Sequence, residues 1–565
     1  MEQLSYWHQT QKPKEYKKLE RDLETDVLIV GGGISGITTA YCLTLRGIKP
    51  VVIEAETLCS GTTGNTTGKL TIQHSIIYSN LMEKYGIDTA REFAKSQTKA
   101  LRFAAETAQK YGMDCQMADS TAYIYAASAN NEKDMLLAEY EAAKRLEIPA
   151  EWITKPPFPK GSKALLGFSG QAVFHPVRYV QCLADAAEAS GAVIYTNTKA
   201  ARVEDGDVKA VVLENGAVIR CRHLVQATQY PIFDGPNLFF TRLYARRDFG
   251  IAVDAKGSWP DGSYINVGEP TRSIRTHVEN GKRILIVVGE SYFPGRDEEE
   301  TGDHYQNLID FAGQVAGVKQ VLAMWAAQDY ETPDQIPYIG RLSDDSNTYI
   351  ATGFRKWGLS SGTLAGLMIA DLIATGNCEF EGLYSRSRRD TWSSMKKITS
   401  EVLAGVGELV KSKLEGTKGY RELGKGEGRP IRFNGRKAGV YRDENDHVTV
   451  LDISCTHMST ELNFNASEKT WDCPAHGGRF KPDGKLLEGP PKNPLPMLFE
   501  GSYAEFLNAV EGGRENPGRE ADQADGSDRP ADMGDAAAFN DLPPGPAYYQ
   551  YPAPPSREMD RRHPT

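Results

Sequence analysis

One glycine-rich turn near the amino end constrains the fold of this chain more than any other feature. The apolar residues 27–30 are followed by GGGISG, in which Gly31, Gly33 and Gly36 have the spacing G-x-G-x-x-G. In such a turn the first glycine permits the bend, the second lets the backbone approach a pyrophosphate, and the third packs a helix on a strand. The pyrophosphate lies at the amino end of that helix, where unpaired N–H groups favour anions. The turn therefore predicts a dinucleotide-binding α/β domain.

Residues 49–71 extend this nucleotide motif. The second strand, KPVVIE, ends at Glu54, about twenty residues after the glycines, where a carboxylate can bind ribose hydroxyl groups. The Gly- and Thr-rich stretch TLCSGTTGNTTGKLT follows, and a plain NAD site does not need it. Because FAD must lie extended with its ring edges packed by protein, this stretch favours FAD over NAD. The FAD contacts expected in this half are Gly31, Gly33, Ser35, Gly36, Glu54, Thr63, Gly64 and Thr67.

Helices and strands alternate as far as about residue 376. Helical patterns cover residues 81–112 and about 131–146, and DVKAVVLENGAVIRCRHLVQAT is typical of strands around the turn ENG. The alternation predicts one large α/β domain over residues 25–376, Rossmann-like and doubly wound, with an inserted antiparallel-sheet domain for substrate. Residues 1–24 are expected to form an N-terminal extension.

A second glycine-rich segment, YIATGFRKWGLSSGTLAGLMIADLI, ends this domain. Glycines let the backbone pass close to a flat ring, and Ser360 or Ser361 is expected to cap the helix that begins there. The positive end of that helix can face the N1–C2=O edge of a flavin, where negative charge collects on reduction. A glycine-rich turn before an amphipathic helix is the structural alternative. The cofactor contacts expected here are Gly353, Gly358, Leu359 and Ser360.

The stretch CTHMSTELNFNASEKTWDCPAH supplies a group of metal ligands. Cys455 and His457 form a C-x-H pair, and Cys473 and His476 form a C-x-x-H pair. Zinc fingers of the C₂H₂ type separate their cysteines from their histidines along the chain, whereas here each half contributes one of each. The interleaved order suits a [2Fe–2S] cluster in which two thiolates bind one iron and two imidazoles the other. Zinc remains the alternative.

These motifs resemble two known families. Residues 24–376 resemble the D-amino-acid-oxidase-like superfamily of FAD oxidoreductases, which includes glycine oxidase, sarcosine oxidase and γ-glutamylputrescine oxidase; the match includes VQATQYP, WAAQDYETPDQIPYIGRL and the segment around Gly358. The stretches CTHMSTELN, WDCPAHGGRF and PDGKLLEGPPKNPLP resemble a Rieske domain, which implies Cys455, His457, Cys473 and His476 as cluster ligands.

The resemblance also carries expectations about bonding. Some relatives attach FAD covalently through a His or a Cys, but this chain has Asn65 in the first region and no Cys in WAAQDY, so we expect noncovalent FAD. Many Rieske proteins join their two ligand loops by a disulfide. The corresponding positions here are Thr460 and Ala475, which implies that this bridge is absent.

Composition changes mark the remaining boundaries. We expect a helical linker over residues 377–417, which leads into the Gly- and Lys-rich join EGTKGYRELGKGEGRP. Short β-type runs alternate with turns after it, which predicts a small all-β domain over residues 418–502. Residues 503–565 are rich in Pro, Gly and Asp, cannot bury enough apolar surface to offset ordering entropy, and are expected to be a disordered tail. A Pro-rich docking ligand is the other interpretation.

Bulk composition excludes several classes of function. The formal charge of −10 argues against general nucleic-acid binding. The amino end lacks the apolar region of a secretory signal, and no stretch reaches the roughly 18 consecutive apolar residues of a membrane span. Eight scattered cysteines in a chain of 565 residues indicate a reduced compartment, and we expect a cytoplasmic protein.

Together the two cofactors predict a redox enzyme. The resemblance implies oxidation of the C–N bond of a small-molecule amine or amino acid by FAD. A Rieske cluster, with a reduction potential of about −150 to +300 mV, would then take the electrons one at a time. The acceptor that receives them is not identified by the sequence and could be a carrier protein, a quinone or O₂. An amine oxidase that uses O₂ with an accessory cluster, and a redox-sensing or electron-transfer protein, are the alternatives.

The sequence does not identify a catalytic base. Four residues flank the flavin segments and are candidates for contact with substrate or oxygen, although a structural role is the simpler interpretation of each: Lys69, Tyr230, Arg355 and Lys356. His175, which precedes Pro176, is expected to be a packing histidine.

Overall fold

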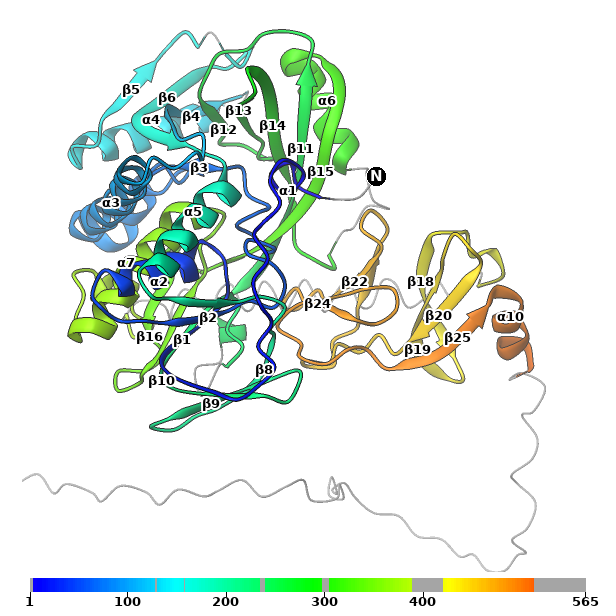
Figure 1. Ribbon diagram of the computed structural model, residues 1–565. Helices are drawn as coiled ribbons and strands as arrows, with labels where there is room; N and C mark the ends of the chain where they lie inside the picture. Colours follow the sequence, from blue (N-terminus) through cyan, green and yellow to red (C-terminus); the bar gives the residue numbers. More distant parts are fainter. Residues whose placement is uncertain are drawn as a thin grey trace, which may run out of the picture. The chain divides into compact units, whose positions relative to one another are not determined.

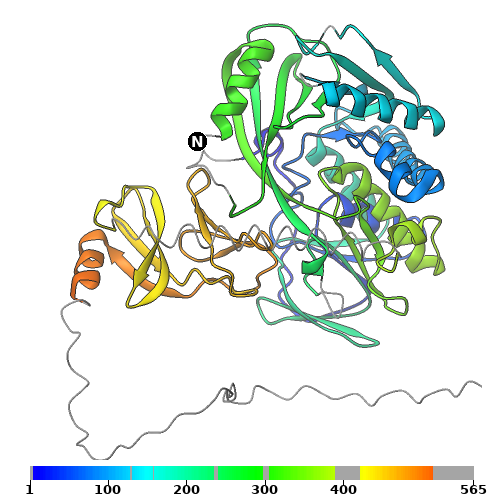
Figure 2. The ribbon, with the colours of Figure 1, turned by 180° about the vertical axis from the view of Figure 1, so that it is seen from behind.

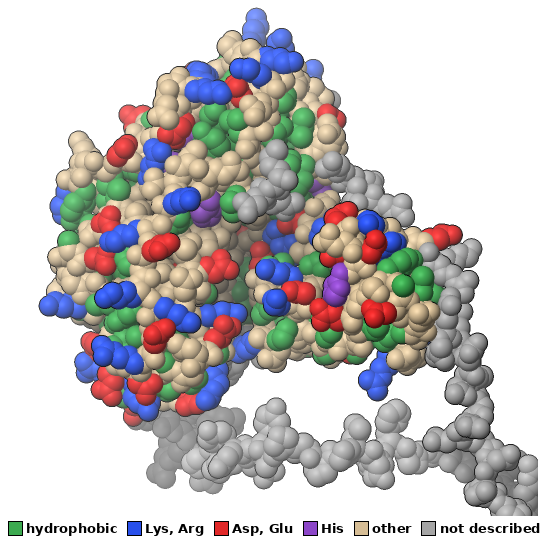
Figure 3. Space-filling model, turned by 45° about the vertical axis from the view of Figure 1, so that its right-hand side comes forward, with side chains coloured by type: hydrophobic (Ala, Val, Ile, Leu, Met, Phe, Trp, Pro, Cys, Tyr) green, Lys and Arg blue, Asp and Glu red, His purple; other side chains and the backbone are tan. Residues whose placement is uncertain are grey.

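The structure is a computed structural model of the 565-residue chain. It describes residues 4–127, 130–156, 158–233, 239–296, 304–388 and 420–512. We call residues 4–388 the N-terminal domain and residues 420–512 the C-terminal domain. Lys, Arg, Asp and Glu side chains are interspersed across the face that Figure 3 shows.

The first sheet of the N-terminal domain contains β1, the strand before the glycine turn (Figure 1). Its main path has the order β16-β17-β10-β1-β2-β7, in which neighbours from β17 to β7 are parallel, and β8 and β9 extend it beside β10. Strand β1 ends in the buried run of residues 27–30, because parallel strands covered on both faces are apolar throughout. The strands are β1 (Leu23–Val30), β2 (Val51–Ile53), β7 (Val193–Tyr195), β8 (Ala200–Glu204), β9 (Lys209–Leu213), β10 (Val218–Gln229), β16 (Tyr338–Arg341) and β17 (Thr348–Thr352).

The second sheet is nine-stranded and largely antiparallel, with the order β15-β11-β14-β13-β12-β4-β6-β3 and β5 beside β6. Helix α6 (His304–Ala316) packs on β11, β14 and β15 through its buried face, as Figure 2 shows from behind. The strands are β3 (Lys69–Leu70), β4 (Ala118–Ala126), β5 (Ala150–Ile153), β6 (Ala164–Val173), β11 (Tyr244–Ala255), β12 (Ser263–Asn266), β13 (Ser273–Glu279), β14 (Lys282–Tyr292) and β15 (Val318–Glu331).

The other helices of this domain include both of those predicted near residues 81–112 and 131–146. Helix α7 is long and apolar enough to cross a membrane, and 72% of it is buried inside the protein. The helices and 3₁₀ turns are α1 (Tyr6–Thr10), α2 (Ile34–Thr44), α3 (Tyr78–Lys110), α4 (Asn130–Arg145), α5 (Pro176–Ala189), α7 (Gly358–Thr375), α8 (Glu381–Tyr384) and η2 (Phe239–Thr241).

The C-terminal domain contains two small antiparallel sheets, with the orders β18-β19-β20-β25 and β21-β22-β23-β24. The predicted fold class, a Rossmann-like domain with an inserted sheet followed by a small all-β domain, is confirmed. The elements are η3 (Tyr420–Glu422), β18 (Glu427–Phe433), β19 (Arg436–Arg442), β20 (His447–Leu451), β21 (Asn463–Asn465), β22 (Thr470–Asp472), β23 (Arg479–Phe480), β24 (Leu486–Glu488), β25 (Met497–Ser502) and α10 (Tyr503–Gly512).

Helix α10 corrects the predicted start of the tail. The first ten residues of the segment expected to be disordered from residue 503 are helical. Phe506 on this helix is fully buried and stacks on Phe433 of β18, so it joins the core of the C-terminal domain. Residues 513–565, and most of the linker predicted at 377–417, lie outside the described residues.

Candidate functional site

A cavity of about 440 Å³ lies where the carboxyl ends of the parallel strands meet the second sheet. Its first wall is the glycine turn between β1 and α2. Gly31 has a φ of +114°, and a methyl group on it would lie 2.4 Å from the carbonyl oxygen of Ala227. A methyl group on Gly36 would lie 1.9 Å from the carbonyl oxygen of Gly31. The turn therefore needs glycine at both positions, and it leaves its inner side open to a ligand.

The amino end of α2 is arranged for an anion. Gly33, the residue before the helix, has no side chain that could cap it. The N–H of Ile34 donates to Thr63 Oγ1 at 3.1 Å. Among the described residues the N–H of Ser35 has no acceptor, which suits a pyrophosphate. Glu54 follows β2 as predicted, and one of its oxygens accepts from the N–H of Gly32 at 2.6 Å.

The opposite end of the cavity is formed by the second sheet and carries Lys69. Its ammonium nitrogen donates to Ser273 Oγ at 2.5 Å and lies 5.6 Å from the centre of the Trp357 ring. Burial, reinforced by the charge of Arg275, lowers the pKa of Lys69 to about 7. An amine in this state exchanges protons near neutral pH, so Lys69 can hold or accept a proton at this end of the cavity.

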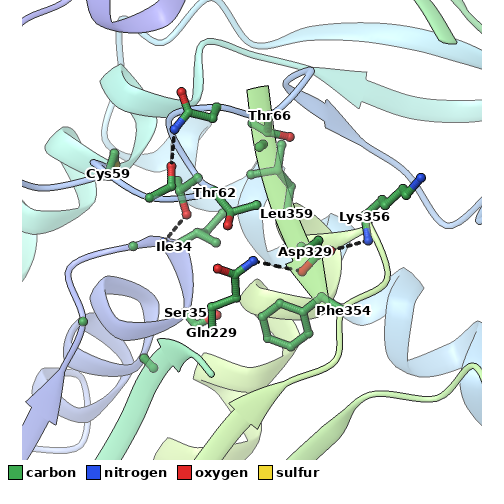
Figure 4. A pocket seen from close by; sticks show the side chains of 18 of the residues that line it. Ile34, Ser35, Cys59, Thr62, Thr66, Gln229, Asp329, Phe354, Lys356 and Leu359 are labelled. Atoms are coloured by element: carbon green, nitrogen blue, oxygen red, sulfur yellow. Dashed lines mark hydrogen bonds between the residues drawn. The ribbon is translucent and has the colours of Figure 1, made fainter. Parts of the chain in front are cut away.

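A buried carboxylate lies on the wall formed by β15. Asp329 accepts from Gln229 Nε2 at 3.2 Å and from the N–H of Lys356 (Figure 4). It also accepts from the N–H of Tyr330 at 2.8 Å. Burial raises the pKa of Asp329 to about 6. These bonds fix the turn of residues 353–356, in which Arg355 and Lys356 both have positive φ. Asp329 thus positions the entry to α7.

The start of α7 differs from the expectation that Ser360 or Ser361 caps it. The helix begins at Gly358, after the uncapped residue Trp357, so both serines lie inside its first turn. Ser360 Oγ instead lies 3.0 Å from Nε2 of His74, whose ring stacks on Trp357. The prediction was wrong because the helix follows directly after the left-handed turn at residues 355–356, so that its cap position, Trp357, lies three residues before Ser360.

The cavity brings together most, but not all, of the predicted cofactor contacts. Those that line it are Gly31, Gly33, Ser35, Glu54, Thr63, Thr67, Gly358 and Leu359. Those that do not are Gly36, Gly64, Gly353 and Ser360. The role of all twelve residues in cofactor binding stays a prediction.

The other candidate residues separate in the same way. Lys69 and Lys356 line the cavity, whereas Arg355 and Tyr230 do not. Lys356 is already paired with Asp248 at 2.8 Å, so Lys69 is the less engaged of the two. His175 is buried, caps α5 through a bond from the N–H of Arg178, and packs on Trp7, as expected of a packing histidine.

Most of the residues that the second sheet contributes to the cavity were not predicted from the sequence. These residues lie on antiparallel strands and loops without a motif, and periodicity alone does not indicate which of them face a ligand. They include Asp248, Ile265, Thr271, Ser273, Val288 and Gly289.

The four predicted cluster ligands lie at the tips of two adjacent loops. The thiols of Cys455 and Cys473 are close enough to share a hydrogen bond, and the rings of His457 and His476 have centroids 5.1 Å apart. The C-x-x-H loop is held by bonds from the N–H of Cys473 to the Gly478 carbonyl and from the N–H of Gly477 to the Cys473 carbonyl. The two cysteine sulfur atoms thus lie close together, and so do the two histidine rings.

This donor set fits a [2Fe–2S] cluster. The Nδ1 atom of His457 is buried and has no hydrogen-bond partner among the described residues, as expected of an atom that binds a metal. Burial lowers the pKa of His476 to about 4, which keeps this imidazole neutral. In the described part of the chain no group of three or more His, Cys, Asp or Glu side chains is placed to hold one metal ion, and each iron of a Rieske centre takes two protein ligands.

The ligand loops pack on the N-terminal domain, and the two domains form one compact body. Hydrogen bonds join Gln328 Nε2 to the Gly477 carbonyl at 2.8 Å and Tyr330 Oη to the Gly489 carbonyl at 2.9 Å. Arg296 donates to the Pro474 carbonyl at 2.9 Å. No room remains between the surfaces at Gly477, where a methyl group would lie 2.3 Å from Cβ of Ala245.

A buried ion network fixes the same interface. Arg247 of β11 pairs with Glu468 of the C-terminal domain, and each side chain is only 5% exposed. Arg479 pairs with Glu468 and Asp472, both at 3.1 Å, and Glu488 lies within 3.6 Å of both arginines. The pKa of Glu468 falls to about 2, because the two arginines outweigh the effect of burial. Charges so enclosed are retained only when they are paired.

Two family models match the chain. The model described as FAD dependent oxidoreductase matches residues 26–372, and the model described as Rieske [2Fe-2S] domain matches residues 418–499. The chain is 34% identical over 496 residues to the "Putative Rieske 2Fe-2S iron-sulfur protein YhfW" of Bacillus subtilis, a match that covers 87% of this chain and 97% of that protein.

More distant relatives match the N-terminal domain. Glycine oxidase of Geobacillus kaustophilus is 24% identical over 63% of this chain and 94% of its own length, and gamma-glutamylputrescine oxidoreductase of Escherichia coli is 24% identical over 63% and 85%. The crystal structure of the former superimposes with a TM-score of 0.55 at 21% identity, covering 65% of this chain and 99% of that one. L-proline dehydrogenase from P. horikoshii gives a TM-score of 0.53 at 18% identity over 65% and 98%. These structures share the fold.

Proposed function

This chain belongs to the FAD-dependent oxidoreductase family and carries a Rieske [2Fe–2S] domain, and from that premise we propose that it oxidises the C–N bond of an amine or amino acid and sends the electrons through the cluster to an external acceptor. The substrate would lose two electrons and two protons to become an imine, which water hydrolyses to a carbonyl compound and ammonia or an amine. When bound, FAD supplies two-electron chemistry and the cluster one-electron chemistry.

The named activities of the relatives support the first half of the proposal. Glycine oxidase and gamma-glutamylputrescine oxidoreductase both act on compounds that carry an amino group. The residues that would hold FAD here are those of the glycine turn, the loop 59–68 and the amino end of α7. The residues that would hold the cluster are Cys455, His457, Cys473 and His476.

Lys69 is the residue that we propose to face the substrate nitrogen. It lines the end of the cavity built by the second sheet, and its one described hydrogen bond goes to Ser273. Substrate amines must be unprotonated before they lose hydride. A neutral lysine amine at this position can take up the proton, because its pKa of about 7 is close to the operating pH.

The observation that carries the electron route is the position of β15. Side chains alternate between the two sides of a strand. Ala327 and Asp329 line the cavity, whereas Gln328 and Tyr330 donate hydrogen bonds to the C-terminal domain. One strand therefore separates the cavity from the ligand loops, which supports direct passage of electrons between the two cofactor sites.

The orientation of the ligand loops agrees with this route. Phe240 of the N-terminal domain meets the rings of both cluster histidines edge-on, with centroids 5.4 Å from His457 and 5.6 Å from His476. The histidine side of the cluster site is thus turned toward the N-terminal domain. Electrons that arrive from the cavity would enter the cluster through its imidazole ligands.

An anaerobic screen of amines and amino acids tests the substrate class. The holoprotein would be mixed with each compound while flavin absorbance is followed, and a true substrate should bleach the flavin without O₂. The same mixtures in air should give little hydrogen peroxide if the cluster is the main outlet. Stoichiometric peroxide would favour an oxidase, and bleaching by no amine would favour a redox-sensing or electron-transfer protein.

A further inference from the structure

A short segment near the amino end lies behind the loop 59–68 that borders the cavity. Five consecutive carbonyl groups of this loop, from residue 64 to residue 68, each accept a hydrogen bond from a distant side chain. The bonds run from Ser5 Oγ to Gly64 at 2.5 Å, from Trp325 Nε1 to Asn65 at 2.9 Å, from Trp7 Nε1 to Thr66 at 2.6 Å, and from Arg275 to Thr67 at 2.6 Å and Gly68 at 2.8 Å.

The other side of the same loop is the cavity wall. Thr62, Thr63, Thr66 and Thr67 line the cavity, whereas Ser5 and Trp7 do not. The carbonyl groups are thus bonded on the side away from the cavity, while the threonine residues line the cavity itself. A loop with five consecutive carbonyls fixed in this way has few alternative conformations.

Two of the five bonds come from residues outside the matched family region. The FAD-dependent oxidoreductase model begins at residue 26, and Ser5 and Trp7 precede it. Both side chains are fully buried. The indole of Trp7 lies edge-on against His175 and His277, at 5.0 and 4.9 Å between ring centroids, and the guanidinium of Arg275 covers its ring at 5.1 Å. The segment is therefore firmly anchored.

Gly64 shows how closely the segment approaches the loop. A methyl group at this position would lie 2.2 Å from Cε1 of His8 and 2.2 Å from the carbonyl oxygen of Cys59. Helix α1 also packs against β15, the strand that carries Asp329. The segment thus supports two walls of the cavity from behind.

We propose that residues 5–8 are a positioning clamp, which holds loop 59–68 in its FAD-binding conformation before the cofactor arrives. A loop that is ordered during folding need not be ordered again on binding, so the clamp raises affinity for FAD without touching it. Ser5 and Trp7 are positioning residues in this account. The inference depends on FAD binding alone and stands apart from the substrate and the electron route.

The substitution Trp7→Phe tests the clamp, because it keeps an aromatic ring between the histidines but removes the N–H that binds Thr66. Trp259→Phe is the matched control: this indole is also buried and donates to Thr276 Oγ1 at 2.8 Å, but it lies in the core beside α6 and does not line the cavity. Titration of apoprotein with FAD should show about tenfold weaker binding in Trp7→Phe and unchanged binding in Trp259→Phe.

Hydrogen exchange of the apoprotein gives a second readout that does not involve catalysis. Amides of residues 59–68 should exchange faster in Trp7→Phe than in the wild type or in Trp259→Phe. If Trp7→Phe does not fold, the smaller change Ser5→Ala decides by the same two measurements. Wild-type FAD affinity and wild-type exchange in a folded clamp variant would overturn the proposal and leave residues 5–8 as packing only.

Discussion

Gln328 and Gly477 belong to different domains and are joined by a hydrogen bond of 2.8 Å from the glutamine Nε2 to the glycine carbonyl. Gly477 directly follows His476, one of the predicted cluster ligands. The main-chain carbonyl of Gln328 accepts bonds from Thr62 and Gln229, both of which line the cavity. One residue of β15 thus connects the cavity wall to the ligand loop.

Replacing Gln328 by leucine should slow the passage of electrons to the cluster. The change removes the side-chain bond to Gly477 and leaves that carbonyl without its donor. The free energy that holds the ligand loop in place should fall by about 1 kcal/mol. Stopped-flow spectroscopy should show flavin reduction by substrate at the wild-type rate and a severalfold slower reduction of the cluster.

Gln97→Leu serves as the control for this change. Gln97 is also buried and donates to Tyr384, but it lies on α3 and does not contact the C-terminal domain. It should leave both rates unchanged. Equal effects of the two substitutions on cluster reduction would argue against a specific role for Gln328.

Arg247→Met should loosen the C-terminal domain. The substitution leaves Glu468 buried with one arginine partner instead of two, and breaking a buried pair costs about 3–5 kcal/mol. Because Arg479 remains, we expect the free energy of unfolding of the C-terminal domain to fall by about 3 kcal/mol. The loss would be measured as a shift of the urea transition in which the visible absorption of the cluster disappears. As a control, Arg202→Met breaks an exposed pair with Glu204 and should change the free energy of unfolding by about 0–1 kcal/mol. A similar loss in both variants would contradict the role of the buried ion network in holding the C-terminal domain.

Lys69→Met should remove a pH-dependent step from substrate oxidation. The neutral amine accepts a proton only above its pKa, so kcat/KM of the wild type should rise with pH and level off above about 7. The variant should be slower and should lack this inflection, whereas Lys110→Met at the end of α3 should keep it. A wild-type pH profile in Lys69→Met would exclude Lys69 as the proton acceptor.

Cys473→Ser should separate the two cofactors. Cys473 is buried at the ligand loop and does not line the FAD cavity. The variant should lose the Rieske EPR signal and its iron, yet it should bind FAD and still be bleached by substrate. Retention of a normal Rieske spectrum would show that the cluster has a different ligand.

The sequence predicted those parts of the molecule that depend on local patterns. The glycines of the turn, the buried strand before them and the four ligands of the cluster are short motifs, and the structure brings the members of each together. The exact start of α7 and the presence of α10 were missed. In α10 the few apolar residues, such as Phe506, were outweighed by the polar composition of the segment that follows.

The contacts that connect these parts could not be predicted. Gln328 and Gly477 are 149 positions apart, and Trp7 and Thr66 are 59 apart. Both contacts depend on how whole elements dock, and no residue pattern along the chain indicates such docking. For the same reason, no pattern in residues 1–24 predicts that they support the cavity wall.

Freeze-quench EPR of the anaerobic holoprotein, after a single mixing with a bleaching substrate, shows whether electrons pass from the flavin to the cluster. If current flows between the two cofactors, the signal of the reduced Rieske cluster should grow as one electron leaves the reduced flavin, and the second electron should stay on the flavin because no external acceptor is present. A flavin that stays fully reduced beside a cluster that stays oxidised would contradict this electron route.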